Sequence, residues 1–120
     1  MNQQTNVYGM PLQPCSFSPQ TGYVRDGYCT CISSDIGQHT ICVIVTESFL
    51  EFSASVGNDL STPRPEFNFP GLLASHQWCL CLSRWIEARD AGCAPHVILE
   101  SSNISILEHV SLEELESYQL

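Results

Sequence analysis

Two long stretches rich in proline and glycine limit how much regular structure this chain can form. Residues 1–39 contain four of the seven glycines and three of the seven prolines, and residues 58–77 contain three more prolines. A residue before proline is pushed towards extended backbone, and glycine favours turns, so neither stretch is expected to be helical. Helices and strands must therefore come from residues 40–57 and from the chain after residue 77.

Four apolar segments predict the strands of a small sheet. The run from Thr40 to Thr46 is β-branched and apolar, a pattern typical of a strand buried on both faces. The last two segments alternate well enough to form a hairpin. The other expected strands are residues 78–82, 97–100 and 104–110.

Three serines predict where the helices begin. Ser48 and Ser111 each stand three residues before a glutamate, which is capping-box spacing, and Ser83 precedes a segment with one apolar face. The expected helices are residues 48–56, 84–91 and 112–118.

These elements predict an α+β fold in a single compact domain, residues 1–120. We expect a small mixed sheet of about four strands with about three helices on one or both faces, and the two irregular stretches packed over one end. Residues 1–39 are expected to pack on the domain as a turn-rich N-terminal arm, and residues 58–77 to form an ordered surface loop.

The charges exclude several classes of function. The chain has no lysine, and its four arginines against 13 acidic residues give a net charge of −9. Binding to a nucleic-acid backbone or to a membrane surface needs clustered bases, and both partners are therefore excluded. Schiff-base chemistry and a phosphate-binding P-loop need a lysine. The expected partner is a small molecule or another protein.

The seven cysteines are expected to be mostly reduced. Their number is odd, the N-terminus has no basic and apolar export signal, and 120 residues suffice for a core without crosslinks. No apolar run approaches the length of a membrane span. We therefore expect a cytoplasmic protein.

Cysteine and histidine spacing leaves a metal site or a reactive thiol as an alternative. Zinc prefers such ligands, and the candidate set is Cys29, His39, Cys42, Cys79 and Cys81. No tight cysteine knuckle is present, and Cys42 and Cys79 lie in apolar runs where cysteine behaves as a small hydrophobic residue. We therefore expect no cofactor. Cys81, just before a predicted helix, has the better setting for a reactive thiol.

The loop of residues 58–71 is the favoured ligand site. It holds Arg64 between two prolines, and a rigidly presented arginine can bind a carboxylate or phosphate through two hydrogen bonds. We expect the site to comprise His39, Asp59, Arg64, Glu66 and Arg84. The alternative is that Arg64 pairs with Asp59 or Glu66 and fixes the loop.

Several motifs also resemble a known family. They are Gly37 to Cys42, Gly57 to Gly71, Trp78 to Cys81, Arg84-Trp85 and Ala91 to Pro95. Together they resemble DUF2237, a family of short bacterial proteins of unknown function, from about Asn6 to the end of the chain. The resemblance implies a single-domain cytoplasmic protein and no particular activity.

The function that the residues favour is a binding or regulatory module. Its expected ligand is a small anionic or polar molecule, or a protein partner, recognised at the 58–71 loop. The alternative is a thiol- or metal-dependent enzyme that uses the cysteine and histidine clusters.

Overall fold

The apolar run that begins at His39 forms the central strand of a three-stranded antiparallel sheet. In the computed structural model, which describes residues 4–67 and 69–119, β1 (His39–Ile44) pairs with β2 (Gln77–Cys81) on one side and β3 (His96–Val97) on the other. Ile41, Cys42 and Val43 are fully buried. The prediction of a strand covered on both faces is therefore confirmed.

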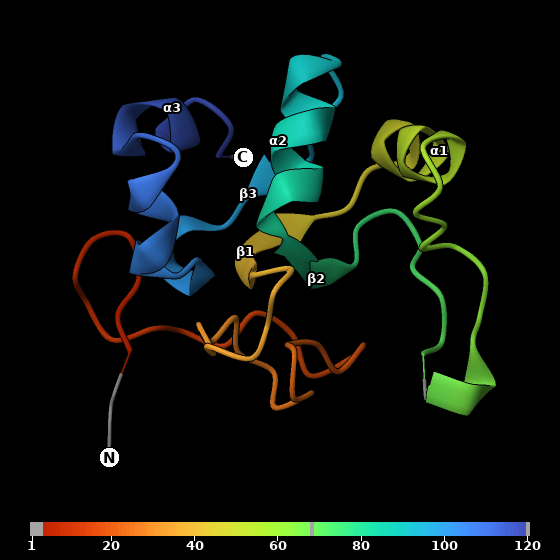
Figure 1. Ribbon diagram of the computed structural model, residues 1–120, viewed down its shortest axis with the longest axis horizontal. Helices are drawn as coiled ribbons and strands as arrows, with labels where there is room; N and C mark the ends of the chain where they lie inside the picture. Colours follow the sequence, from red (N-terminus) through yellow and green to blue (C-terminus); the bar gives the residue numbers. More distant parts are fainter. Residues whose placement is uncertain (1–3, 68, 120) are drawn as a thin grey trace.

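Three α-helices accompany the sheet, as expected (Figure 1). The first is capped by Thr46, whose side chain accepts a hydrogen bond from the Phe49 amide at 3.2 Å, and not by Ser48. Ser111 caps the last helix, as its spacing predicted. The helices are α1 (Glu47–Ser55), α2 (Leu82–Asp90) and α3 (Leu112–Glu116).

Ser83 does not begin a helix. The second helix starts at Leu82, two residues before its predicted start at residue 84, and its N-cap residue is Cys81, which makes no side-chain capping hydrogen bond. The strand β2 therefore passes directly into α2, with no loop between them. Cys81 lies at the junction of the two elements.

The expected fourth strand is wrong. Residues 104–108 form a 3₁₀ helix, because the Asn103 side chain accepts a hydrogen bond from the Ser105 amide and its carbonyl accepts one from Ile106. The third strand is also shorter than predicted, and a 3₁₀ turn, Leu99–Ser101, follows it. Every strand pair in the described sheet is antiparallel, so the expectation of a mixed sheet is wrong as well.

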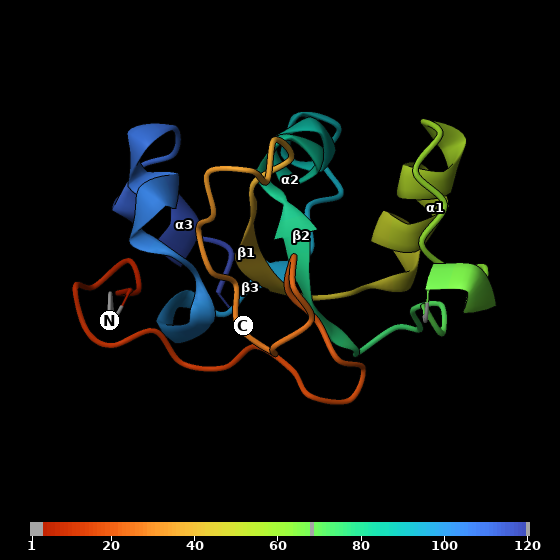
Figure 2. The same cartoon turned by 60° about the horizontal axis from the view of Figure 1, so that its bottom comes forward.

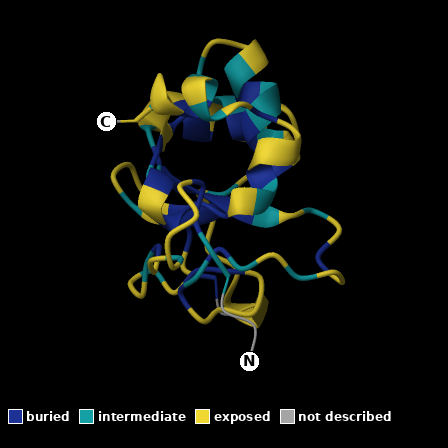
Figure 3. Cartoon of the chain, turned by 90° about the vertical axis from the view of Figure 1, so that its left-hand side faces the viewer, coloured by how far each residue is buried: buried dark blue, intermediate teal, exposed yellow. Residues whose placement is uncertain are grey.

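The core lies where the helices meet the sheet. Trp85 of α2, Phe49 of α1 and Ile41 of β1 are at most 1% exposed. Figure 3 shows the buried residues gathered on the strands and on the inward faces of the helices. The radius of gyration of 13.2 Å is that of one compact globule of this length, for which about 13.6 Å is usual.

Most of the N-terminal segment, residues 4–38, lies on the side of the sheet away from α2, and only its end, residues 36–38, reaches the start of that helix (Figures 1 and 2). It contains only turns and isolated bridges. Buried side chains join it to the rest of the chain: Thr21 Oγ1 accepts a hydrogen bond from the Cys79 amide at 2.8 Å, and Asn103 Nδ2 donates to the Cys29 carbonyl at 3.2 Å. This segment therefore forms a second layer over the sheet.

The loop after α1 is closed by a glycine that no other residue can replace without strain. Gly71 has φ +80°, and a Cβ atom there would lie 2.5 Å from the Ser61 carbonyl oxygen. Between these residues the loop contains one 3₁₀ turn, Pro65–Phe67. The two ends of the loop are therefore held side by side.

Across the described residues, no helix is long and apolar enough to cross a membrane.

We predict that Ile106→Ala lowers the free energy of unfolding by about 2–5 kcal/mol, since this fully buried side chain belongs to the core. Urea denaturation measures the change. Ile36→Ala is the matched control: Ile36 is 95% exposed, and its removal should cost no more than about 0.5 kcal/mol. Equal losses in the two variants would show that the 3₁₀ segment does not contribute to the core.

Candidate functional site

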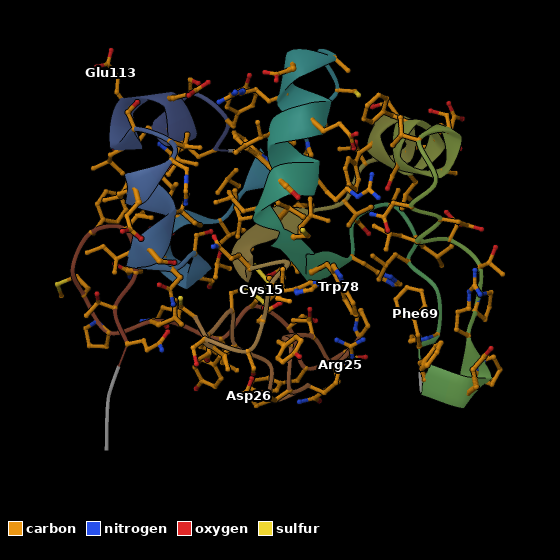
Figure 4. All side chains as sticks on the ribbon, viewed as in Figure 1. Cys15, Arg25, Asp26, Phe69, Trp78 and Glu113 are labelled. Atoms are coloured by element: carbon orange, nitrogen blue, oxygen red, sulfur yellow. A yellow bond between two sulfur atoms is a disulfide. The ribbon has the colours of Figure 1, made fainter. Side chains whose placement is uncertain are left out.

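Residues of the two irregular stretches and of β2 line an open pocket of about 260 Å³. We call it the arginine pocket. Figure 4 shows Arg25, Trp78 and Phe69 lying in this region on three separate segments. The lining residues are Arg25, His39, Asp59, Leu60, Arg64, Phe67, Phe69 and Trp78.

Arg25 is held in place over an aromatic ring. Its guanidinium carbon lies 5.0 Å from the centre of the Trp78 ring, a cation–π arrangement, and Nη1 donates to the Gly22 carbonyl at 2.8 Å. The backbone of Arg25 has φ 59°, in the left-handed region that non-glycine residues rarely adopt. Such strained residues cluster at functional sites, where the surrounding structure holds them in place.

Arg64 lines the same pocket from the loop after α1. Its backbone amide donates to the Phe69 carbonyl at 2.7 Å, and its carbonyl accepts from the amides of Phe67 and Phe69, which closes a tight turn. Among the described residues its side chain forms no ion pair. No ion pair in the described structure therefore supports the alternative that Arg64 pairs with Asp59 or Glu66.

Asp59 is occupied by its own turn. Its carboxylate accepts hydrogen bonds from the Thr62 hydroxyl at 2.6 Å and from the amides of Ser61 and Thr62 at 2.9 and 3.3 Å. The Thr62 hydroxyl, then the Ser61 amide, lower the pKa of Asp59 below its ordinary 3.8, and the charge of Arg64 contributes least. Asp59 therefore shapes the rim of the pocket and leaves Arg64 available.

His39 is oriented by a buried carboxylate. The Asp35 side chain is 1% exposed and accepts two hydrogen bonds from His39, from the backbone amide at 2.8 Å and from Nδ1 at 2.9 Å. The imidazole also stacks on Tyr23, with ring centres 6.0 Å apart. Because Nδ1 is engaged, Nε2 is the nitrogen left for a ligand or a proton.

The other two arginines are paired elsewhere. Arg84, on α2, contacts Glu87 at 3.1 Å, and Arg89 contacts Asp90 and Glu114. Among the described residues, the two arginines outside any ion pair are thus the two that line the arginine pocket.

Three of the five expected site residues line this pocket: His39, Asp59 and Arg64. Glu66 is exposed on the 3₁₀ turn, and neither it nor Arg84 belongs to the lining. Sequence reasoning missed Arg25, whose only signal was the scarcity of basic residues in the chain.

The expectation that the cysteines are mostly reduced is wrong, because four of the seven form disulfides. The pairs are Cys15–Cys42 and Cys29–Cys79, and all four residues are at most 5% exposed. We call them the four-sulfur cluster. The odd count is accounted for by the free cysteines, which are Cys31, Cys81 and Cys93.

The fold explains this pairing. In the sheet register Cys42 of β1 stands opposite Cys79 of β2, and the N-terminal segment brings Cys15 and Cys29 onto them. Chain position gives no sign of this convergence. The zinc set expected from the sequence is therefore divided. Three of its cysteines lie in the four-sulfur cluster. His39 and Cys81 lie outside the cluster and face each other across β1 and β2, where this strand pair ends.

Cys81 and His39 share a small site of their own. The Cys81 thiol donates to the Gly37 carbonyl at 2.8 Å. A Cβ atom on Gly37 would lie 3.4 Å from this sulfur and 3.1 Å from Cε1 of His39. The thiol and the imidazole therefore border the same glycine, with Asp35 behind the imidazole.

Comparison with known proteins identifies one family. The family described as "Uncharacterized protein conserved in bacteria (DUF2237)" matches residues 5–119, nearly the whole chain, which confirms the resemblance seen in the sequence. No curated protein matches the chain.

We predict that Thr62→Val raises the pKa of Asp59 towards 3.8, because it removes the strongest donor to the carboxylate. NMR titration of the side-chain carboxyl measures it. Since the folded pKa is the lower one, the ionised carboxylate stabilises the fold above the unfolded pKa, and this contribution is lost as the pH falls through the folded pKa. Ser55→Ala removes a hydroxyl that donates to the Phe52 carbonyl and not to Asp59, so it should leave the pKa of Asp59 unchanged. An unchanged pKa in Thr62→Val would contradict the assignment.

Proposed function

The chain belongs to the DUF2237 family, and because that family is uncharacterised we propose a function from the geometry of the chain itself. We propose that the protein binds a small anionic ligand in the arginine pocket. One observation carries the proposal. In a chain of net charge −9, the two arginines with no ion pair in the described structure line the same pocket, with His39 beside them.

The lining defines the chemistry of the ligand. Guanidinium groups bind carboxylates and phosphates through paired hydrogen bonds. Phe67, Phe69 and Trp78 offer aromatic walls that suit a flat or apolar body attached to the anionic group. A volume near 260 Å³ is slightly below the range of about 300–1,000 Å³ usual for drug-sized ligands. The favoured ligand is therefore a small aromatic or apolar carboxylate or phosphate.

The surrounding charge narrows this class further. The acidic surface disfavours a polyanion, so nucleic acid is not a proposed ligand. Asp59 at the rim can accept a hydrogen bond from a hydroxyl or amine of the same ligand. A protein partner that presents a carboxylate beside an apolar side chain is the other proposed occupant.

We predict that Arg64→Ala and Arg25→Ala each weaken binding of phenyl phosphate or benzoate by about 10-fold or more, the effect of losing a charged hydrogen bond. NMR shifts of the Trp78 indole measure the affinity. Arg64→Ala should leave stability nearly unchanged, because the exposed side chain pairs with no charged group in the described structure.

Arg84→Ala is the matched control, because it removes an arginine outside the pocket. It should leave the affinity unchanged. Failure of both probes to shift the Trp78 signals, or an equal loss of affinity in Arg84→Ala, would contradict the proposal.

The site of Cys81 favours a second function, a thiol-dependent enzyme. Cys81 would be the nucleophile and His39 the base, with Asp35 orienting the imidazole, the arrangement of roles that activates a cysteine. Because His39 also lines the arginine pocket, a bound anionic ligand would lie near this thiol. The two proposals therefore share one residue.

We predict that Cys81 reacts with iodoacetamide faster than the other two free cysteines, and that His39→Ala slows it. Peptide mass spectrometry resolves the three sites. Exposed Cys31 is the internal reference, and burial raises the pKa of the Cys93 thiol, which should react slowly. Reaction of Cys81 no faster than that of Cys31 would contradict the enzyme proposal.

Cytoplasmic location is part of the proposal. Disulfides are rare in the cytoplasm, so a protein working there needs another means of holding the four-sulfur cluster together.

A further inference from the structure

We propose that the four-sulfur cluster, once reduced, is a binding site for one zinc ion. The Sγ atoms of Cys15, Cys29 and Cys79 all lie within 4.8 Å of one another. Cys42 is bonded to Cys15, so its sulfur lies next to this group but is not one of the three within 4.8 Å of one another. Four potential ligands thus converge from the N-terminal segment, β1 and β2.

The spacing of the sulfurs fits tetrahedral coordination. Zn–S bonds of about 2.3 Å place the four sulfurs of a tetrahedral site about 3.8 Å apart. Three sulfurs already lie within 4.8 Å of one another, and the fourth, on Cys42, has to move closer to Cys29 and Cys79 once its disulfide to Cys15 is reduced. Three of the four ligands would therefore be near their places before the metal binds.

Buried hydroxyls hold the two strand ligands. The Cys42 amide donates to Ser102 Oγ at 3.0 Å, and the Cys79 amide donates to Thr21 Oγ1 at 2.8 Å. Both hydroxyl-bearing residues are fully buried. These bonds involve the backbone and not the sulfur, so they persist whether the sulfurs are oxidised, protonated or bound to metal.

The donor set selects the metal. Four thiolates and no carboxylate in the cluster suit a soft or borderline ion, and four protein ligands leave no open position. Such a closed site is structural and would stabilise the fold. In the cytoplasm, the location proposed above, four buried cysteines indicate metal binding more often than a disulfide framework.

The two states of the cluster interconvert by balanced steps. Each disulfide takes two electrons and two protons from a dithiol reductant, which itself becomes a disulfide. The four resulting thiols then lose four protons as Zn²⁺ forms four Zn–S bonds. Disulfides and zinc are therefore alternative crosslinks between the same four residues, and the zinc form is the one suited to a reducing compartment.

This site differs from the zinc set expected from the sequence. Cys15 takes part, and His39 and Cys81 do not, since His39 is held by Asp35 and the Cys81 thiol donates to Gly37. The zinc proposal does not rest on ligand binding in the arginine pocket, because none of the four cluster cysteines belongs to its lining.

The test uses the full chain carrying C31S, C81S and C93S, so that only the four cluster cysteines remain. The protein is reduced with a phosphine without oxygen, and titrated with Co²⁺ and then with Zn²⁺. We expect one equivalent of Co²⁺ with the charge-transfer and d–d bands of tetrahedral thiolate coordination, displaced by one Zn²⁺. The oxidised protein should bind neither ion. Circular dichroism shows whether the reduced protein is folded. A reduced protein that is folded and yet binds no Co²⁺ would overturn the proposal.

Two variants at one ligand make the test specific. In the same background, Cys15→Ala should weaken Co²⁺ binding at least about 10-fold, and Cys15→His should keep one tetrahedral Co²⁺ with weaker sulfur charge-transfer bands. His39→Ala should leave Co²⁺ binding unchanged. If His39→Ala abolishes binding and Cys15→Ala does not, the site is elsewhere. If the reduced protein unfolds, Zn²⁺ should restore its circular dichroism, and failure to restore it would also overturn the proposal.

Discussion

The four-sulfur cluster is the constraint on which the rest of the structure depends. It joins the N-terminal segment, which has no helix and no strand of the sheet, to β1 and β2. The two disulfides link residues that are 27 and 50 positions apart in the sequence, and each reduces the entropy of the unfolded chain. Either disulfide taken alone stabilises the fold by roughly 3–5 kcal/mol. Little regular hydrogen bonding would otherwise keep this segment on the sheet.

The arginine pocket depends on that attachment. Arg25 belongs to the crosslinked segment and Arg64 to the proline-rich loop, and Trp78 on β2 lines the same pocket and supports Arg25. Each arginine is positioned by backbone hydrogen bonds of its own turn. The candidate site is thus formed by two irregular segments mounted on a small sheet, as is common for binding sites on loops.

Local sequence signals predicted the elements that depend on local physics. The β-branched run after Thr40 forms the central strand, and the Ser111 capping box begins the last helix. The apolar alternation in residues 104–110 was misleading. The Asn103 side chain accepts a hydrogen bond from the Ser105 amide and so favours a 3₁₀ helix, and the pattern of apolar residues carries no information about such a bond.

The parts that the sequence did not predict are contacts between distant residues. Nothing in the spacing of the cysteines shows that Cys15 reaches Cys42, because the strand register and the path of the N-terminal segment decide it. The same holds for Arg25, which reaches the pocket only because its segment is fixed over Trp78. Proline rigidity and the scarcity of bases, both visible in the sequence, drew attention to the loop of Asp59 and Arg64, and the fold places His39 in the same pocket lining.

Hydrogen exchange tests most directly whether the four-sulfur cluster holds the N-terminal segment on the sheet. Exchange is measured by mass spectrometry on the oxidised protein and on the reduced protein with a chelator present. Our account predicts that reduction speeds the exchange of amides in residues 15–31 by at least about 10-fold, while β1 keeps its protection. Equal exchange of residues 15–31 in the two states would contradict it.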